Sequence, residues 1–170
     1  NTDNRNQTHI SMDFTGKVVV ITGASSGIGE ALVYAFADRG AKVVMGARNS
    51  AKLAEIAAQL FPRGIETAFE ATVVTPEADC NRLIDKALSA FGRIDILICN
   101  AGISMRALFD DVQLDVLRQL MDVNFWGTVY CAKYALPALQ AAKGTLVGVS
   151  SVAGMHGLPG RTGYSASKFA

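Results

Sequence analysis

The segment Lys17–Gly29, which reads KVVVITGASSGIG, constrains the fold more than any other part of the chain. It begins with a short run of β-branched residues, which is typical of a strand buried on both faces. Three glycines, Gly23, Gly27 and Gly29, then precede an apolar-periodic segment, Glu30–Arg39. Glycines let a backbone approach a phosphate closely, and the free N–H groups of a helix start point at the anion. The segment therefore predicts a phosphate cradle, with an ordinary strand–turn–helix connection as the alternative.

The rest of the chain alternates between short apolar runs and helical patterns. Further strands are predicted at Ala41–Met45, Ile65–Ala71, Ile94–Cys99 and Thr145–Val149. Helices are predicted at Ala51–Leu60 after a Ser50 cap, from Pro76 to Phe91 before Gly92, over Gln113–Ala142 with weak points at Gly127 and Pro137, and from Tyr164 to Ala170. The strands lack two-residue alternation and helices intervene between them. This pattern predicts an α/β fold with a doubly wound parallel sheet covered on both faces.

Length and composition limit the classes of protein that fit. With 170 residues, of which 50% are hydrophobic, the chain predicts one domain over 12–170, after a polar leader over 1–11 that ends before a natural start at Met12. A net charge of +1 offers no basic field for nucleic acid. No apolar run approaches the ~20 residues of a membrane span, and the polar residues 1–12 lack the apolar centre of a secretory signal. The scattered Cys80, Cys99 and Cys131 lack metal-ligand spacing. We therefore expect a cytoplasmic protein with reduced thiols, without a metal, nucleic-acid or membrane partner.

Small, polar or basic residues follow four of the predicted strands. These ends are Thr22–Gly23, Ala47–Arg48, Asn100–Gly102 and Ser150–Ser151. Ligands of open parallel sheets bind beyond the carboxyl ends of the strands, so we expect a binding site there. Turn residues that merely end strands are the alternative for any one of the four.

Asn124 and the pair Tyr164 and Lys168 are further candidates for chemistry. Asn124 continues the helical stripe of Leu117, Leu120 and Met121, where its amide needs partners. It is either a structural tie to a neighbouring backbone or an anchor beside a site. Tyr164 and Lys168 lie four residues apart and share a helix face, where an ammonium favours a phenolate. Such pairs are also common on helix surfaces.

Taken in order, these motifs resemble the short-chain dehydrogenase/reductase family, over about Phe14 to Ala170. Thr22–Gly29 is similar to its TGxxxGIG cofactor loop, Asn100–Gly102 to its NAG motif, and Tyr164–Lys168 to its YxxxK motif. Ser151 precedes the tyrosine by the family's interval. The resemblance implies a Rossmann fold. It assigns cofactor binding to Gly23, Ser25, Ser26, Gly27, Ile28, Gly29, Arg48, Asn100, Ala101, Gly102, Tyr164 and Lys168.

The resemblance also implies four catalytic residues. Tyr164 would be the general acid in carbonyl reduction or the base in alcohol oxidation. Lys168 would favour its phenolate and hold the nicotinamide ribose hydroxyls. Ser151 would position the substrate oxygen, and Asn124 would hold a water in a proton relay.

The cofactor preference follows from charge. Members that prefer NAD carry an acidic residue at the end of the second strand, whereas this chain has Ala47 and Arg48. A guanidinium suits a 2′-phosphate, so we expect NADP(H) rather than NAD(H). Alternatively, Arg48 is simply a solvated strand end.

The chain departs from the family pattern in a few places. Thr72 stands where an aspartate is frequent, Cys99 replaces the first asparagine of NNAG, and Gly148 replaces an asparagine. Members also continue through two more strands, so the C-terminal strands of the fold are expected to be missing from this chain.

The expected function is hydride transfer between NADP(H) and a small-molecule carbonyl or secondary alcohol, by a homodimer or homotetramer. The alternative is a nucleotide-binding scaffold of the same family without turnover. An epimerase or dehydratase of the related extended family is disfavoured, because its glycine loop typically has the shorter spacing TGxxGxxG.

Overall fold

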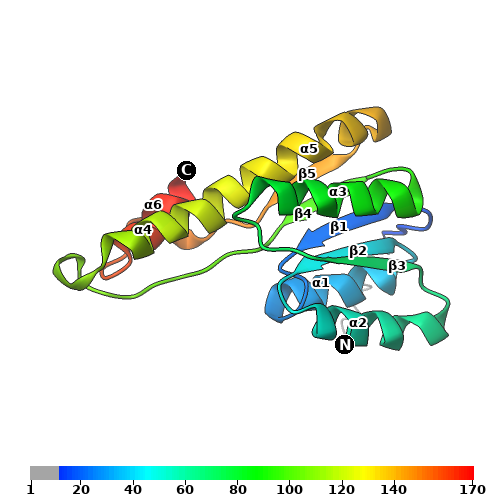
Figure 1. Ribbon diagram of the computed structural model, residues 1–170, viewed down its shortest axis with the longest axis horizontal. Coiled ribbons are helices and arrows are strands. Elements are labelled where there is room, and N and C mark those ends of the chain that lie inside the picture. The colour runs from blue at the N-terminus through cyan, green and yellow to red at the C-terminus, as the bar shows by residue number, and fades with distance from the viewer. Residues whose placement is uncertain (1–11) are drawn as a thin grey trace, which may run out of the picture.

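The computed structural model describes residues 12–170, which form one parallel sheet with helices on both faces (Figure 1). The strands are β1 (Val18–Thr22), β2 (Lys42–Ala47), β3 (Thr67–Ala71), β4 (Ile96–Cys99) and β5 (Thr145–Gly148). Their order in the sheet is β3-β2-β1-β4-β5, and every neighbouring pair is parallel. The chain therefore reverses its direction of winding between β3 and β4. This is the predicted doubly wound Rossmann topology, which is confirmed.

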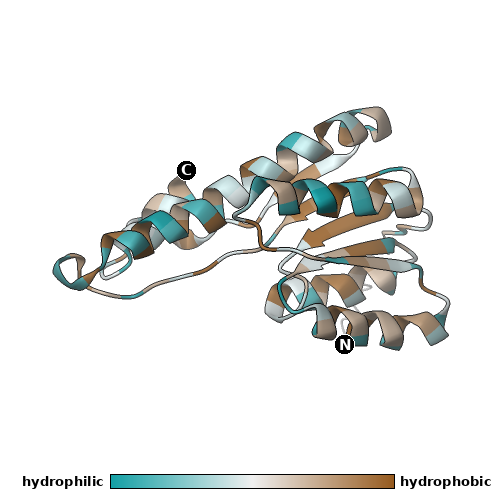
Figure 2. Ribbon diagram, in the orientation of Figure 1, coloured by the Kyte–Doolittle hydropathy of each residue, from teal (hydrophilic) through white to brown (hydrophobic). Residues whose placement is uncertain are grey.

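Helices on the two faces of the sheet enclose two separate cores. α1 (Gly27–Ala37) and α2 (Ser50–Leu60) cover one face, and α3 (Glu77–Phe91) and α5 (Gly127–Ala142) cover the other. Along β1, Val19 and Ile21 enter the first core while Val18 and Val20 enter the second. Both faces of β1 are therefore apolar, which is why the sequence shows no alternation of polar and apolar residues there. Figure 2 shows the same contrast, with hydrophobic central strands and hydrophilic segments along α3 and α4.

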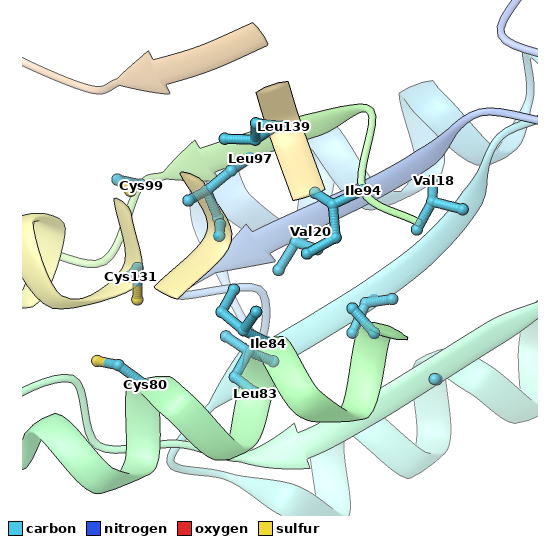
Figure 3. Packing of buried hydrophobic residues seen from close by; sticks show 14 of the residues in the cluster. Val18, Val20, Cys80, Leu83, Ile84, Ile94, Leu97, Cys99, Cys131 and Leu139 are labelled. Carbon is cyan, nitrogen blue, oxygen red and sulfur yellow. The ribbon is translucent and has the colours of Figure 1, made fainter. Parts of the chain in front are cut away.

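The second core is drawn from close by in Figure 3. Leu83 and Ile84 of α3 point toward Val20 of β1 and Ile94 ahead of β4. All four side chains are at most 1% exposed. Burying such a side chain stabilises the fold by about 1.5–3 kcal/mol, so this packing holds α3 firmly against the sheet.

A buried carboxylate connects the starts of β1 and β4. Asp95, 4% exposed, accepts hydrogen bonds from Arg93 Nε at 2.9 Å, from the N–H of Val18 at 3.0 Å and from Lys17 Nζ at 3.2 Å. Burial alone would raise the pKa of Asp95, but the bonds from Arg93, Val18 and Lys17 outweigh it and lower that pKa. This carboxylate lies at the amino ends of β1 and β4, at the opposite end of these strands from their carboxyl ends.

Several boundaries differ from those predicted. α1 begins at Gly27, one turn before Glu30, so two loop glycines belong to its first turn. The cap of α2 is Asn49 rather than Ser50, because the Asn49 side chain accepts from the N–H of Lys52 at 3.0 Å. Pro76 precedes α3 as its N-cap instead of occupying its first position.

The long helical stretch is continuous but changes its winding. α4 (Leu114–Met121) leads into one π-helical turn, η3 (Asp122–Trp126), and then into α5. Pro137 lies inside α5 without ending it. The π turn was not predicted, and it contains Asn124; such turns are frequent at functional sites.

The last helix lies beyond the carboxyl edge of the sheet. After β5, a short 3₁₀ turn, η4 (Val152–Gly154), leads to α6 (Thr162–Phe169), which packs beside α4 (Figure 1). Gly163 permits this approach, because a Cβ there would overlap the side chain of Leu117. Within residues 12–170, no helix combines the length and the apolar character that a membrane crossing requires.

Candidate active site

The ends of β1 and β4 are joined by hydrogen bonds that hold the glycine-rich turn in place. The Thr22 hydroxyl accepts from the N–H groups of Asn100 and Ala101, both at 3.0 Å. The side-chain amide of Asn100 donates to the carbonyl oxygens of Thr22 at 3.0 Å and Gly23 at 3.4 Å. Two motifs that lie 77 residues apart in the chain thus form one unit at the carboxyl edge of the sheet.

Close contacts require two glycines of this turn, Gly23 and Gly29. Gly23 has a φ of +66°, and a Cβ on it would lie 2.9 Å from Cα of Ala101. A Cβ on Gly29 would overlap the carbonyl oxygen of Gly23. No side chain caps the start of α1 at Ser26, which leaves the first N–H groups of the helix free for an anion.

A cavity of about 380 Å³ opens in front of this turn. It is lined by the carboxyl ends of β1 to β4 and by one side of the α4–η3 helix. The residues are Gly23, Ser25, Ser26, Ile28, Ala47, Arg48, Thr72, Val73, Val74, Thr75, Asn100, Ala101, Gly102, Ile103, Gln119 and Val123. Three of the four predicted strand ends, those after β1, β2 and β4, therefore meet at one cavity, whereas the fourth, Ser150–Ser151, does not line it.

Arg48 supplies the positive charge of this cavity. It follows β2 and is exposed, and no carboxylate of residues 12–170 forms an ion pair with it. Ala47, at the end of the strand, is buried, so no acidic side chain stands at this position of the cavity. A guanidinium without a carboxylate partner can receive an anionic group of a ligand.

Ser151, Tyr164 and Lys168 lie outside the wall of this cavity, on η4 and α6. The Ser151 hydroxyl accepts from the N–H of Ala153 at 3.2 Å, and Lys168 Nζ donates to the carbonyl of Val149 at 2.8 Å. A Cβ on Gly154 would overlap the carbonyl oxygen of Lys168, so η4 lies directly against the end of α6. Close packing thus brings the serine segment to the helix that carries the tyrosine and the lysine.

Asn124 connects α6 to the segment that follows β4. Its Oδ1 accepts from the N–H of Ile103 at 2.8 Å, and its Nδ2 donates to the carbonyl of Ile103 at 2.9 Å and to Ser167 Oγ at 2.8 Å. Ser167 in turn donates to the carbonyl of Tyr164 at 2.8 Å. The side chain is 6% exposed and fully partnered. Its amide therefore ties together neighbouring backbone, and because Ile103 lines the cavity the same bonds anchor main chain beside the site, so the contacts agree with both interpretations of the sequence.

Gly102 lies where the cavity meets α6. A Cβ at this position would lie 3.2 Å from Asn124 Oδ1 and 3.5 Å from Lys168 Nζ. Gly102 also lines the cavity. Lys168 and Asn124 therefore lie next to the cavity wall, on the other side of Gly102, the last residue of the NAG motif.

Some residues of the cavity were not predicted from the sequence. Thr22 was assigned to a strand end, but its hydroxyl organises the NAG motif. Thr72, directly after β3, is small and polar like the predicted strand ends and could have been found with them, whereas Val73 and Val74 are apolar and lack that signal. Gln119 carried no such signal, because only the packing of α4 brings it to the cavity.

The cysteines take no part in this site. All three are free and buried, and burial raises the pKa of the Cys99 thiol to about 12. Such a thiol stays protonated and is a poor nucleophile. Within the described part of the chain, no group of three or more His, Cys, Asp or Glu residues is placed to hold a metal ion.

Comparison with known proteins identifies the family. Residues 17–170 match the family model described as short chain dehydrogenase. The chain therefore belongs to the short-chain dehydrogenase/reductase family, an oxidoreductase family, and the resemblance of its motifs is confirmed.

Curated relatives include plant enzymes. The chain is 44% identical over 164 residues to 11-beta-hydroxysteroid dehydrogenase A of Arachis hypogaea, and this match covers 95% of the chain and 47% of the relative. It is 41% identical over 165 residues to 11-beta-hydroxysteroid dehydrogenase A of Sesamum indicum, covering 96% and 47%. The chain thus spans about half the length of the curated relatives it matches.

Solved structures confirm the fold. An alcohol dehydrogenase from Thermococcus sibiricus, complexed with 5-hydroxy-NADP, matches with a TM-score of 0.89 and 30% identity, over 91% of this chain and 66% of the other. A short-chain dehydrogenase/reductase from Burkholderia phymatum, in complex with NAD, matches with a TM-score of 0.89 and 32% identity, over 94% and 57%. Both bound molecules are dinucleotides of the nicotinamide type.

Proposed function

We propose that this protein transfers a hydride between NADP(H) and a carbonyl or secondary alcohol, with Tyr164 as the general acid or base. One observation carries the proposal. Gly102 lines the cavity at the glycine-rich turn and also lies beside Lys168, which is on the same helix as Tyr164. This contact supports a single site that would contain both the cavity and the candidate proton donor.

The residues of the cavity fit a dinucleotide. Gly29 has no side chain, and a Cβ there would overlap the carbonyl oxygen of Gly23, so the backbone of the turn stays accessible. The uncapped start of α1 offers its N–H groups to a pyrophosphate. Arg48 would pair with a 2′-phosphate, which NADP has and NAD lacks. Asn100, Ala101 and Gly102 would line the cofactor on the β4 side, and Ser25, Ser26 and Ile28 on the α1 side.

The bound dinucleotide would supply or accept the hydride, and this chain would move the proton. Tyr164 would donate its hydroxyl proton to the substrate oxygen during reduction, and would take that proton back during oxidation. Ser151 would hold the same oxygen through its hydroxyl. Lys168, already close to Gly102, would favour the phenolate by its charge and bind the ribose hydroxyls.

Asn124 would act in this scheme through its position between the cavity wall and α6. Its side chain bonds to both Ile103 and Ser167, which holds the residue that lines the cavity at a fixed position relative to α6. Both N–H groups of the Asn124 amide already donate, so a relay water could bond to this side chain only as a donor to Oδ1, which accepts one bond in the structure.

The substrate and the assembly are extensions of this proposal. The curated relatives are named as hydroxysteroid dehydrogenases, so we propose a hydroxysteroid or a similar apolar alcohol. Met155 and Leu158, 72% and 38% exposed, lie in the loop between Ser151 and Tyr164 and would offer an apolar surface to such a molecule. A homodimer or homotetramer in the cytoplasm is the expected state.

The test is transfer of a label from the cofactor to the product. NADPH deuterated at C4 is incubated with a panel of ketosteroids, and the alcohol is analysed by mass spectrometry. Deuterium in the product is expected. Tyr164→Phe should lower kcat by about 10²–10⁴ and leave NADPH binding intact.

Tyr34→Phe is the matched control, because within residues 12–170 the Tyr34 hydroxyl bonds to Gln59 of α2 alone and Tyr34 does not line the cavity. Equal rates in the two variants would remove Tyr164 from the mechanism. NADPH binding without turnover of any carbonyl would favour the second candidate, a nucleotide-binding scaffold. The free guanidinium of Arg48 and the glycine turn would serve that function equally well.

A further inference from the structure

The segment Ile103–Ala107, which follows the NAG motif, is fastened to the catalytic helix at two separate points. The first is the amide of Asn124, which bonds both to the backbone of Ile103 and to Ser167 of α6. The second involves Arg161, which has no part in the scheme above. Between these two points lies the part of the segment that leaves the cavity wall.

Arg161 joins this segment through its side chain, and its neighbour Gly160 does so through its backbone. Arg161 NH1 donates to Ser104 Oγ at 2.7 Å. The N–H of Ala107 donates to the carbonyl of Gly160 at 2.9 Å. Gly160 has a φ of +68°, a conformation that other residues rarely adopt, so the direction of this carbonyl depends on glycine.

Arg161 is also held against the tyrosine. It is the N-cap residue of α6, and its carbonyl accepts from the N–H of Ser165 at 2.7 Å. Its guanidinium carbon lies 5.7 Å from the centre of the Tyr164 ring, within the range of a cation–π contact. No carboxylate of residues 12–170 forms an ion pair with Arg161, so these contacts are not weakened by a competing partner.

We propose that Arg161 is a positioning residue that fixes the Tyr164 ring relative to the cavity wall. Only a guanidinium has the geometry for both contacts, because its planar face can lie on the ring while an edge N–H reaches Ser104. Together, the two contacts of Arg161 hold the first turn of α6 against the segment Ile103–Ala107. This proposal rests on the proposed function, since it assigns Tyr164 to the reaction.

The experiment compares Arg161→Gln with Arg106→Gln in the intact protein. Arg106 is exposed, carries the same charge and lies next to Gly160, but its side chain makes no hydrogen bond within residues 12–170. Arg161→Gln should lower kcat by about ten- to a hundredfold, as expected for a displaced catalytic group. The Kd for NADPH, measured by cofactor fluorescence, should stay within about twofold of the wild-type value. Arg161→Lys should not restore kcat, because an ammonium cannot make both contacts.

Equal kcat values for the two glutamine variants would overturn the proposal, and so would a loss of NADPH affinity that accounts for the whole effect. If the wild-type protein turned over no carbonyl, the proposed function would fail while the tie could still be tested. Hydrogen exchange of the Ala107 amide would then decide. Faster exchange in Arg161→Gln than in Arg106→Gln supports the tie, and equal exchange overturns it.

Discussion

Leu97 and Leu146 are direct partners in the ladder between β4 and β5, yet their surroundings are opposite. Leu97 is fully buried in the core beneath α3 and α5, whereas Leu146 is 48% exposed. The contrast extends to whole strands, since every residue of β1 is buried and every residue of β5 is exposed. A residue is therefore not buried merely because its strand is hydrogen-bonded in the sheet. It becomes buried where helices cover both faces of that strand.

This difference separates the two halves of the site. The glycine turn and Arg48 lie at the ends of β1 and β2, which the cores hold on both faces. Ser151 follows the exposed strand β5, and Tyr164 and Lys168 lie on a helix beyond the sheet edge (Figure 1). Polar ties such as Asn124 to Ser167 hold this second half in place. The candidate cofactor residues thus follow strands that are buried on both faces, whereas the candidate residues of proton transfer depend on the local packing and hydrogen bonds of α6.

The largest expected difference between the two halves is in stability. Leu97→Ala should lower the free energy of unfolding by about 2–5 kcal/mol, because it leaves a cavity in a packed core. Leu146→Ala should lower it by no more than about 0.5 kcal/mol, the usual limit for a surface substitution. Urea denaturation of this 170-residue chain measures both, and similar losses would show that β5 is covered in solution.

The next effect concerns the cofactor half. If Arg48 binds a 2′-phosphate as proposed, Arg48→Asp should shift the NADP/NAD affinity ratio toward NAD by about ten- to a hundredfold, because repulsion would replace a charge-assisted bond. Fluorescence titration with NADPH and NADH measures the ratio. Arg63→Asp, which changes the charge equally at the opposite edge of the sheet, should leave the ratio unaltered. An unchanged ratio in Arg48→Asp would mean that Arg48 does not read the phosphate.

The smallest effect concerns Asp95, the buried carboxylate that joins β1 and β4. Its pKa is lower in the folded than in the unfolded chain, so it stabilises the fold above the unfolded pKa of about 4. That contribution is lost as the pH falls from about 4 through the lower folded pKa. Asp95→Asn should be less stable at pH 7 and should lose less on acidification. Unfolding free energies at pH 7 and pH 3 test this, and parallel losses in both proteins would contradict it.

The sequence alone predicted the fold and most of the candidate site. β-Branched runs without alternation indicated buried parallel strands, and the intervening helices indicated double winding. Strand ends pointed to Arg48 and to the NAG motif, both of which the structure places at one cavity. These signals are local, because strand and helix periodicity and glycine's backbone freedom depend on near neighbours in the chain.

Other features were decided only by the tertiary structure. The π turn at Asn124, the position of Gln119 in the cavity and the contact of Arg161 with Ser104 have no signature in the sequence. Arg161 and Ser104 are 57 residues apart, and they meet because α6 packs beside α4 beyond the sheet edge. Periodicity tells which face of a segment is buried, but it does not tell which distant segment covers that face. The sequence therefore determined the elements and their order, and packing decided which polar side chains would meet.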